Sequence, residues 1–377
     1  MSAIANTHFI GYNNRIDFYE TAHGVIPRGD ANTATNDWAG FSSDINRSVK
    51  ANSTFTTNIT STYSLVYTTS LAYSGGVLAP NGDIHFVPLG ANRGQKISAA
   101  GVVSTYSLVY TGGTYSGGIL APNGDIHFIP TSAPAGQKIS PSGVVSTYSL
   151  IYTTTFAYFG GVLASNGDIH FVPGAAIVGQ KISSAGVVST YSITNTSISN
   201  RYFGGVLAPN GDIFFINRST SIGQKISASG VVSTYSLVYT ATNGFYGGIL
   251  APNGDIHFVP GNANRGQKIA SDGTVSTYSL VYTTGTGAYQ GGVLAPNGDI
   301  HFIPNAAVVG QKISVSGVVS TYSLPYTISG AYSGGVLTPN GNIFFVPSSA
   351  ALGSILYTNS ARPLDFGTCA SPYLNKL

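Results

Sequence analysis

Apolar and polar positions alternate along the chain in short runs, and the same runs return throughout residues 62–358. Each unit contains four of them, which in the first copies read GGVLA, DIHFVP, GQKIS and VVSTYSLVY. Alternation with a period of two, together with many β-branched and aromatic residues, is typical of strands. None of these runs has the 3.6-residue period of a helix. The pattern therefore predicts an all-β chain of short strands.

The spacing of the repeat predicts how these strands are grouped. A Gly-Gly pair followed by Val-Leu or Ile-Leu occurs seven times at intervals of 42 to 44 residues. Pro-Asn-Gly between the first two runs predicts a hairpin with a type I′ turn, and a Ser/Ala-rich turn ending in glycine predicts a second hairpin. Four antiparallel strands in each of seven repeats indicate a seven-bladed β-propeller. The pairs begin at Gly75, Gly117, Gly160, Gly204, Gly247, Gly291 and Gly334.

The two ends of the array complement each other. Residues 62–68 have the sequence of a fourth strand with no first three before it, and the last copy stops after its third strand, GSILYT. Pairing of the N-terminal strand with the C-terminal blade would close the ring and remove exposed edges. We therefore expect a closed propeller over residues 62–358, an extended N-terminal arm or anchor over 1–61, and a tail over 359–377.

The repeat resembles those of the WD-repeat and kelch-like propeller families. The phrase PNGDIHF is similar to the Asn-Gly-x-Ile-Tyr phrase of kelch-like repeats, with histidine in place of tyrosine. This resemblance implies the fold, whereas propellers serve as enzymes, lectins and scaffolds alike. The WD dipeptide and the Ser-x-Asp-x-Gly-x-x-Trp box of sialidases are missing from the sequence, which speaks against those two subfamilies.

Three polar residue types recur with the repeat and are candidates for catalysis or metal binding. The histidines of neighbouring blades would lie about 10 Å apart, too far to share a zinc ion, and phenylalanine replaces them in two copies. We therefore expect rings that pack between blades. Aspartate and lysine are lost together in the last copy, which favours a contact within one blade, or an aspartate that fixes its hairpin turn. The residues are His85, His127, His170, His257 and His301; Asp83, Asp125, Asp168, Asp212, Asp255 and Asp299; and Lys96, Lys138, Lys181, Lys225, Lys268 and Lys312.

The connections that differ between copies are the second source of candidates. Those leading into each Gly-Gly pair, and those between the second and third strands, vary in length and content, and in a four-stranded blade both emerge at the same end. Aromatic residues near the pair suit recognition of a protein or a sugar, and the alternative is a ring of tyrosines that seals the axis. The candidate binding residues are Tyr73, Tyr115, Tyr158, Phe159, Arg201, Tyr202, Phe203, Arg218, Phe245, Tyr246, Tyr289 and Tyr332.

Composition narrows the classes of partner. Charged residues make up 8% of the chain and the formal net charge is +3, with no basic stripe that would follow a nucleic-acid backbone. No signal peptide or membrane span is recognisable. Cys369 is the only cysteine, so an internal disulfide is excluded, and the spacing of histidine and acidic residues indicates neither a metal site nor a cofactor.

These observations lead to three functional hypotheses. The first is a non-enzymatic structural or binding protein, an exposed virion component for decoration or attachment, on the virion or an extracellular surface. Residues 1–61 would bind protein partners in the larger assembly, and the face with the variable loops would bind a surface glycan or receptor. The second is a lectin-like, glycan-binding propeller. The third is a lyase or hydrolase acting at the mouth of the ring axis.

Overall fold

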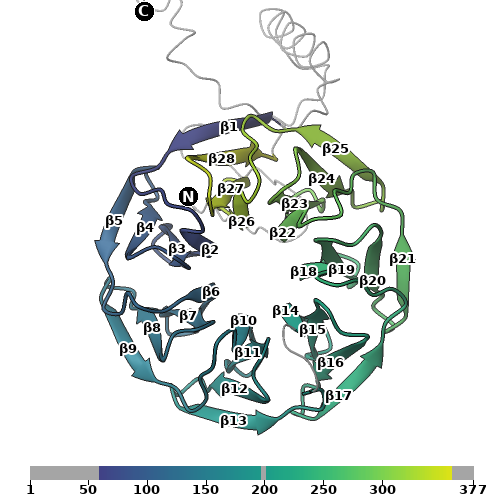
Figure 1. The fold of residues 1–377 in the computed structure, drawn as a ribbon, viewed down its shortest axis with the longest axis horizontal. Helices are drawn as coiled ribbons and strands as arrows, with labels where there is room; N and C mark the ends of the chain where they lie inside the picture. The colour runs from purple at the N-terminus through teal and green to yellow at the C-terminus, as the bar shows by residue number, and fades with distance from the viewer. Residues whose placement is uncertain (1–58, 197–200, 359–377) are drawn as a thin grey trace, which may run out of the picture. The chain divides into compact units, whose positions relative to one another are not determined.

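Seven four-stranded antiparallel sheets form a ring (Figure 1). The computed structural model describes residues 59–196 and 201–358. The all-β, seven-bladed propeller expected from the sequence is confirmed. Within these two ranges, no helix is long and apolar enough to cross a membrane.

Each blade extends from an inner strand at the ring axis, through two middle strands, to an outer strand at the rim (Figure 1). In blades 1 to 7 the inner strands are β2 (Tyr73–Leu78), β6 (Tyr115–Leu120), β10 (Tyr158–Leu163), β14 (Tyr202–Leu207), β18 (Phe245–Leu250), β22 (Tyr289–Leu294) and β26 (Tyr332–Leu337). The second strands are β3 (Ile84–Pro88), β7 (Ile126–Pro130), β11 (Ile169–Pro173), β15 (Ile213–Asn217), β19 (Ile256–Pro260), β23 (Ile300–Pro304) and β27 (Asn342–Pro347).

The outer half of each blade is built in the same way. The third strands are β4 (Arg93–Ile97), β8 (Ala135–Ile139), β12 (Val178–Ile182), β16 (Ile222–Ile226), β20 (Gly266–Ile269), β24 (Val309–Ile313) and β28 (Leu352–Tyr357). The outer strands of blades 1 to 6 are β5 (Val103–Ser107), β9 (Val145–Ser149), β13 (Val188–Ser192), β17 (Val232–Ser236), β21 (Val275–Tyr278) and β25 (Val319–Ser323).

The outer strand of blade 7 comes from the other end of the described chain, and it closes the ring (Figure 1). This strand, β1 (Ile59–Ser64), pairs antiparallel with β28 from Ile59 opposite Tyr357 to Ser64 opposite Leu352. The predicted closure is confirmed, but β1 begins three residues before the strand expected over 62–68. Of the expected N-terminal arm, residues 1–58 lie outside the described residues, as does the expected tail over 359–377.

A buried glutamine explains why the outer strands end earlier than expected. The sequence predicts that strand pairing continues through Leu-Val-Tyr, but the amides of Val66 and Tyr67 instead donate to Oε1 of Gln95 at 3.0 and 2.8 Å. Gln95 belongs to β4 of the next blade and is fully buried. Its amide oxygen thus ends one strand and holds two blades together. Equivalent buried residues are Gln137, Gln180, Gln224, Gln267 and Gln311.

The hairpin between the inner and second strands differs from the predicted type I′ turn. The amide of Gly82 donates to the carbonyl of Ala79 at 2.9 Å, and the amide of Ala79 donates to the carbonyl of Asp83 at 2.8 Å. Gly82 has a φ of +86°, whereas Asn81 is not among the residues with positive φ. These features fit a type I turn followed by a glycine bulge. Pro80 accounts for the difference, because its ring holds φ near −65° at the first central position.

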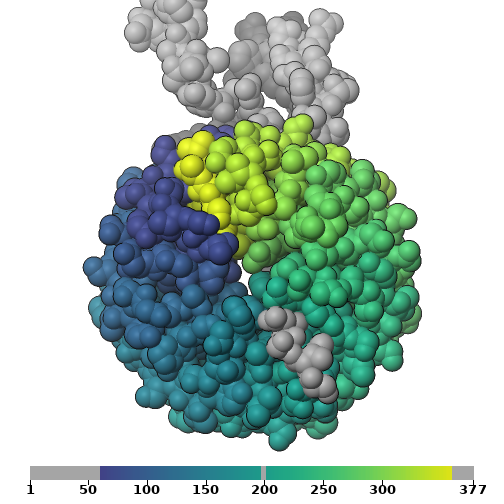
Figure 2. Space-filling view, in the orientation of Figure 1, coloured from purple at the N-terminus to yellow at the C-terminus, as the bar shows by residue number. Residues whose placement is uncertain are grey.

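The first glycine of each Gly-Gly pair allows the inner strands to crowd around the axis. All seven have positive φ, from 70° to 110°. A Cβ atom on Gly75 would lie 3.2 Å from the Cα atom of Gly117 in the next blade. The same contact follows from Gly117 to Gly160, Gly160 to Gly204, Gly204 to Gly247, Gly291 to Gly334 and Gly334 to Gly75. Side chains would not fit here, as the sequence predicted, and a narrow opening is left on the axis (Figure 2).

The hydrophobic core is divided among the seven boundaries between blades. At the first boundary, Val77 and Val87 of blade 1 pack with Tyr115, Ile126 and Phe128 of blade 2. The second glycine of each pair makes room for this packing. A Cβ atom on Gly118 would lie 2.7 Å from Cγ2 of Val77. The lack of a side chain at both glycine positions therefore determines how closely neighbouring blades approach each other.

The repeated aspartate and lysine form an ion pair within one blade, as expected. Nζ of Lys96 lies 2.7 Å from Oδ2 of Asp83, while the amide of Ala99 donates to Oδ1 of the same aspartate at 3.1 Å. Burial opposes ionisation, but these hydrogen bonds outweigh it and lower the pKa of Asp83. The same pair occurs in blades 2 to 6. In blade 7 its two positions are occupied by Asn342 and Ile355.

The repeated histidine lies between blades and packs on a tyrosine of its own blade. The rings of His85 and Tyr106 meet edge-on with centroids 5.5 Å apart, and Nδ1 of His85 lies 3.4 Å from the tyrosine hydroxyl. His85 also lines a cavity together with Ile126 and Ile139 of blade 2. Burial, followed by repulsion from Lys96, lowers its pKa to about 4, against a smaller opposing effect of Asp83.

We predict that replacing an axial glycine destabilises the ring more than replacing a turn glycine. Gly101→Ala imposes a positive φ of +82° on an L residue and meets no atom within 4 Å, a cost of about 1 kcal/mol. Gly117→Ala adds a backbone clash with Gly160, 3.2 Å from the new Cβ, so its unfolding free energy should fall by clearly more. Urea unfolding of the two variants measures the difference. Equal losses would mean that close approach at the axis is unimportant.

We also predict that stability falls as the pH drops from about 6.5 towards 4. The pKa of all five repeated histidines is about 4 in the folded protein and about 6.5 when unfolded. In this interval the unfolded chain binds more protons, so each histidine removes up to about 1.4 kcal/mol per pH unit. Thermal unfolding from pH 7.5 to 4.5 tests this.

The sequence itself supplies a variant for the same pH series. Phenylalanine occupies the histidine position in blade 4, where Phe214 packs against Tyr235 with centroids 5.4 Å apart. His170→Phe copies this pair in blade 3 and should reduce the slope of stability against pH by about one fifth. A slope that is unchanged by this substitution, or a flat profile for the native protein, would contradict the prediction.

Candidate functional site

The two sets of variable connections lie together at one end of the blades. The connection before β2 and the one after β3 are joined by the hydrogen bond from the amide of Leu89 to the carbonyl of Ala72, at 2.9 Å. Neighbouring blades are joined at the same level, where the amide of Ala157 donates to the carbonyl of Thr131 at 2.7 Å. We call the end that carries these connections the variable face. Here a change of residues alters the surface without altering the strands.

Most of the aromatic residues that the sequence marked for binding are inside the protein. All seven that lie two residues before a Gly-Gly pair have no exposed surface. The ring of Tyr73 packs on Phe86, with centroids 5.5 Å apart, and its hydroxyl donates to the carbonyl of Arg93 at 3.3 Å. A surface ligand cannot reach these rings in this structure, and they pack between blades instead of sealing the axis. They are Tyr73, Tyr115, Tyr158, Tyr202, Phe245, Tyr289 and Tyr332.

Arg201, another of the expected binding residues, is also buried. It is 1% exposed, and its Nη2 donates to the carbonyl of Ala176. Burial lowers its pKa. Its backbone carbonyl accepts from the amide of Arg218 at 2.7 Å, so Arg201 supports the loop that carries Arg218. Its side chain is therefore part of the scaffold below the surface.

The remaining expected residues do come together. Phe159, Phe203 and Tyr246 are the second residues of three successive inner strands, β10, β14 and β18. Phe159 and Phe203 stack with centroids 5.2 Å apart, and Phe203 meets Tyr246 edge-on at 5.1 Å. We call these three residues the aromatic arc. The same position holds Ser74, Ser116, Gln290 and Ser333 in the other blades, so the arc belongs to one side of the axis.

Arg218 lies against all three rings of the arc. Its Cζ atom is 5.3 Å from the ring centroid of Phe159, 5.7 Å from that of Phe203 and 5.0 Å from that of Tyr246. Attraction between a cation and the faces of aromatic rings holds the guanidinium in this place. It comes from the loop between β15 and β16, so blades 3, 4 and 5 together build the cluster.

The sequence analysis missed one residue of this region, Phe156. This residue is 51% exposed, and its ring stacks on that of Phe159 with centroids 6.0 Å apart. It has a φ of +58°, a conformation that is costly for a large side chain. At the corresponding position three of the other copies have glycine, at Gly113, Gly287 and Gly330. Aligning the copies at this position would have singled out Phe156.

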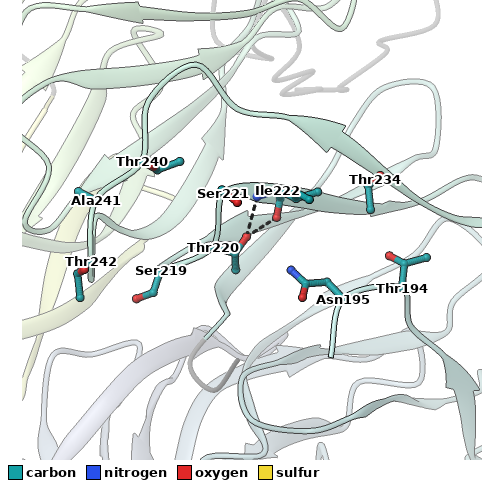
Figure 3. Close-up of a pocket in the computed structure, with 10 residues that line it drawn as sticks. All are labelled: Thr194, Asn195, Ser219, Thr220, Ser221, Ile222, Thr234, Thr240, Ala241 and Thr242. Carbon is teal, nitrogen blue, oxygen red and sulfur yellow. Dashed lines mark hydrogen bonds between the residues drawn. The ribbon is translucent and has the colours of Figure 1, made fainter. Parts of the chain in front are cut away.

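A groove is lined in part by residues 219–222, which directly follow Arg218 in the chain (Figure 3). It has a volume of about 650 Å³. One wall carries Thr194 and Asn195, another carries Thr240 and Thr242, and the loop of blade 4 lies between them (Figure 3). We call it the blade-4 groove. Its lining residues are Thr194, Asn195, Ser219, Thr220, Ser221, Ile222, Thr234, Thr240, Ala241 and Thr242.

The chemistry of the groove is that of hydroxyl groups. Seven of the ten lining residues are serine or threonine, one is asparagine, and none is charged. Three of the hydroxyls are used locally: Thr194 donates to Oε1 of Gln224 at 3.0 Å, Thr220 accepts from the amide of Ile222 at 3.0 Å, and Ser219 accepts from the amide of Asn243 at 3.1 Å. In the described residues, the hydroxyls of Thr234 and Thr240 have no hydrogen-bond partner. The groove can therefore both donate and accept hydrogen bonds to a polar ligand.

Comparison with known proteins identifies the fold. No family model and no curated protein matches the sequence. Among solved structures, a streptogramin B lyase is similar over 79% of this chain and 98% of its own, with 19% identity and a TM-score of 0.69. A catalytically inactive H270A virginiamycin B lyase from Staphylococcus aureus, solved with quinupristin, covers 80% and 100% at 17% identity and a TM-score of 0.70. The WD40 propeller domain of Doa1 covers 80% and 98% at 12% identity and a TM-score of 0.57.

These similarities correct one expectation. The sequence analysis predicted a protein that is not an enzyme, because its repeated aspartates are equivalent and provide no pair of carboxylates in different environments. Two of the similar propellers are lyases. The prediction is therefore wrong in excluding an enzyme on the basis of the repeat, since proteins with a similar fold are lyases.

Proposed function

We propose that the protein is a ligand-binding propeller that recognises a glycan in the blade-4 groove. The observation that carries this proposal is the lining of the groove, in which hydroxyl and amide groups predominate and charge is absent. Sugar hydroxyls donate and accept hydrogen bonds in the same way as serine and threonine, so such a lining matches a sugar surface.

The position of the groove also supports the proposal. Eight of its ten lining residues belong to connections that differ from blade to blade, and the other two, Ile222 and Thr234, belong to β16 and β17. The connection before β14 is the longest of the set, with nine residues before the Gly-Gly pair counted from Asn195. Binding and specificity are commonly carried by loops on a rigid scaffold. The groove thus occurs where this repeat protein departs furthest from its repeat.

Attachment to a larger assembly stays a prediction of the sequence alone. Residues 1–61 were expected to bind protein partners, as in an exposed component of a virus particle, and all but 59–61 lie outside the described residues. Because β1 is hydrogen-bonded along its length to β28, a segment that precedes β1 is tied directly to blade 7. This would let an attached arm hold the propeller firmly.

Removing two exposed hydroxyls from the groove should weaken glycan binding. Thr234→Val with Thr240→Val keeps the shape of both side chains and removes two hydrogen-bonding groups, so we expect a loss of about tenfold in affinity. An array of immobilised oligosaccharides identifies the ligand, and titration with the strongest binder measures the loss. Thr321→Val with Thr327→Val is the matched control, because these threonines have the same spacing at the rim of blade 6. Absence of binding to every glycan would refute the proposal.

A second candidate function is catalysis at the mouth of the ring axis. It is supported by the similarity to streptogramin B lyase and virginiamycin B lyase. In the described residues the five histidines lie between blades with a pKa of about 4, so a base at the axis would come from other groups. If the activity is shared, incubation with quinupristin should consume the intact compound, as measured by chromatography and mass spectrometry. Full recovery of quinupristin would reject this reaction.

A further inference from the structure

Arg218 has a positive charge that the described residues leave without an acidic partner. All six ion pairs of the described residues join a repeated lysine to a repeated aspartate. The guanidinium of Arg218 makes one hydrogen bond there, from Nη2 to the hydroxyl of Tyr246 at 3.4 Å, and its Nε is buried without a partner. A guanidinium has five N–H donors. Most of its hydrogen-bonding capacity is therefore unused.

The aromatic arc holds this charge without neutralising it. Aromatic rings interact with the flat face of a guanidinium, whereas its N–H groups point outward in the plane. Half-burial among three rings also removes water that would otherwise weaken the charge. Planar groups with two or three oxygens, such as carboxylate, and tetrahedral groups such as sulfate, match the N–H fork of arginine. The arrangement favours an anionic group as the missing partner.

The backbone conformation of Phe156, which has a positive φ, also indicates a functional role beside the aromatic arc. This residue has a φ of +58° and is held by the hydrogen bond from its amide to Oγ of Ser132 at 3.1 Å. Leu71 has the corresponding conformation in blade 1, with a φ of +53°, and its amide donates to Oγ of Ser349 at 3.1 Å. A large exposed side chain kept in a costly conformation is commonly a sign of function. Only Phe156 of the two stacks on the aromatic arc, through Phe159.

We propose that Arg218 binds a carboxylate or sulfate group of the ligand and that Phe156 stacks against a sugar ring of the same ligand. The protein would then select acidic glycans. This inference rests on the proposed function, because it specifies the class of glycan that the variable face recognises. It divides the site into two parts, with hydrogen bonds from the blade-4 groove and charge recognition by Arg218 beside the axis.

The test compares the same oligosaccharides in neutral, carboxylated and sulfated forms on one array, with the full-length protein. We expect the bound forms to be acidic, and the array itself distinguishes carboxylate from sulfate. Arg218→Gln should weaken binding of the acidic form at least tenfold, with little change for the neutral one. Arg93→Gln and Arg265→Gln are matched controls. These arginines also lie over tyrosine rings on the variable face, at 5.0 Å from Tyr67 and 5.3 Å from Tyr239.

Failure of this inference can be told apart from failure of the groove proposal. Equal binding of neutral and acidic forms, or a control variant as weak as Arg218→Gln, would overturn the role of Arg218. Loss of binding with the groove double variant would in that case still support the groove. Conversely, binding of the acidic glycan that depends on Arg218 but not on Thr234 and Thr240 would overturn only the proposal for the groove. An array without any bound glycan would overturn both.

A second pair of variants separates binding from folding. Phe156→Gly removes a ring and relieves the positive φ, so the melting temperature should stay equal or rise while affinity for the acidic glycan falls at least fivefold. Leu71→Gly relieves the same strain in blade 1 and should leave affinity unchanged. A purely structural role for Phe156 predicts that stability falls and affinity does not, which would overturn its part in the site.

Discussion

The close approach of the inner strands at the ring axis is the constraint on which the rest of the structure depends. Six contacts between first glycines bring neighbouring backbones together, and the second glycines receive valine or isoleucine side chains of the preceding blade. Each blade therefore packs tightly against the next one at its inner strand. The core widens outward from there, between blades instead of within one central layer. A side chain at either glycine position would change the spacing of the entire ring.

This packing buries polar residues that recur with the repeat, and each of them needs a hydrogen-bond or ion-pair partner. Aspartate and lysine pair across the second and third strands, histidine packs on tyrosine at the blade boundary, and glutamine accepts two amides from the preceding blade. Each of these groups would cost free energy if it were buried without its partner. Their fivefold or sixfold repetition is accounted for by folding. Specific recognition has to come from residues that differ among the copies.

Blades 3, 4 and 5 show where these differences gather. They place aromatic rings at the axis where the other blades have serine or glutamine, and Arg218 bridges them. The contact between first glycines is missing at Gly247, directly after Tyr246 of the aromatic arc. Residues of the same loop also line the blade-4 groove, in which hydroxyl groups predominate. Blades 3, 4 and 5 thus form a distinct sector of the ring, although their strands are arranged as in the other blades.

The sequence by itself determined the class of fold, the number of blades, the closure of the ring and the division into a uniform and a variable end. These follow from local periodicity, turn residues and spacing, which are properties of short segments. It also located the ion pairs, because their loss in blade 7 was coordinated. The turn type was wrong, since Pro80 restricts φ at the position that a type I′ turn would need positive.

Only the tertiary structure decided which aromatic residues are accessible. Tyr73 and its equivalents have the same sequence signature as residues at a binding surface, yet packing against the preceding blade buries them completely. Phe159, Phe203, Tyr246 and Arg218 come from three blades, and their meeting depends on the angle between those blades. Neither burial nor convergence is encoded in a local pattern, because both arise from residues of different blades that the ring brings into contact.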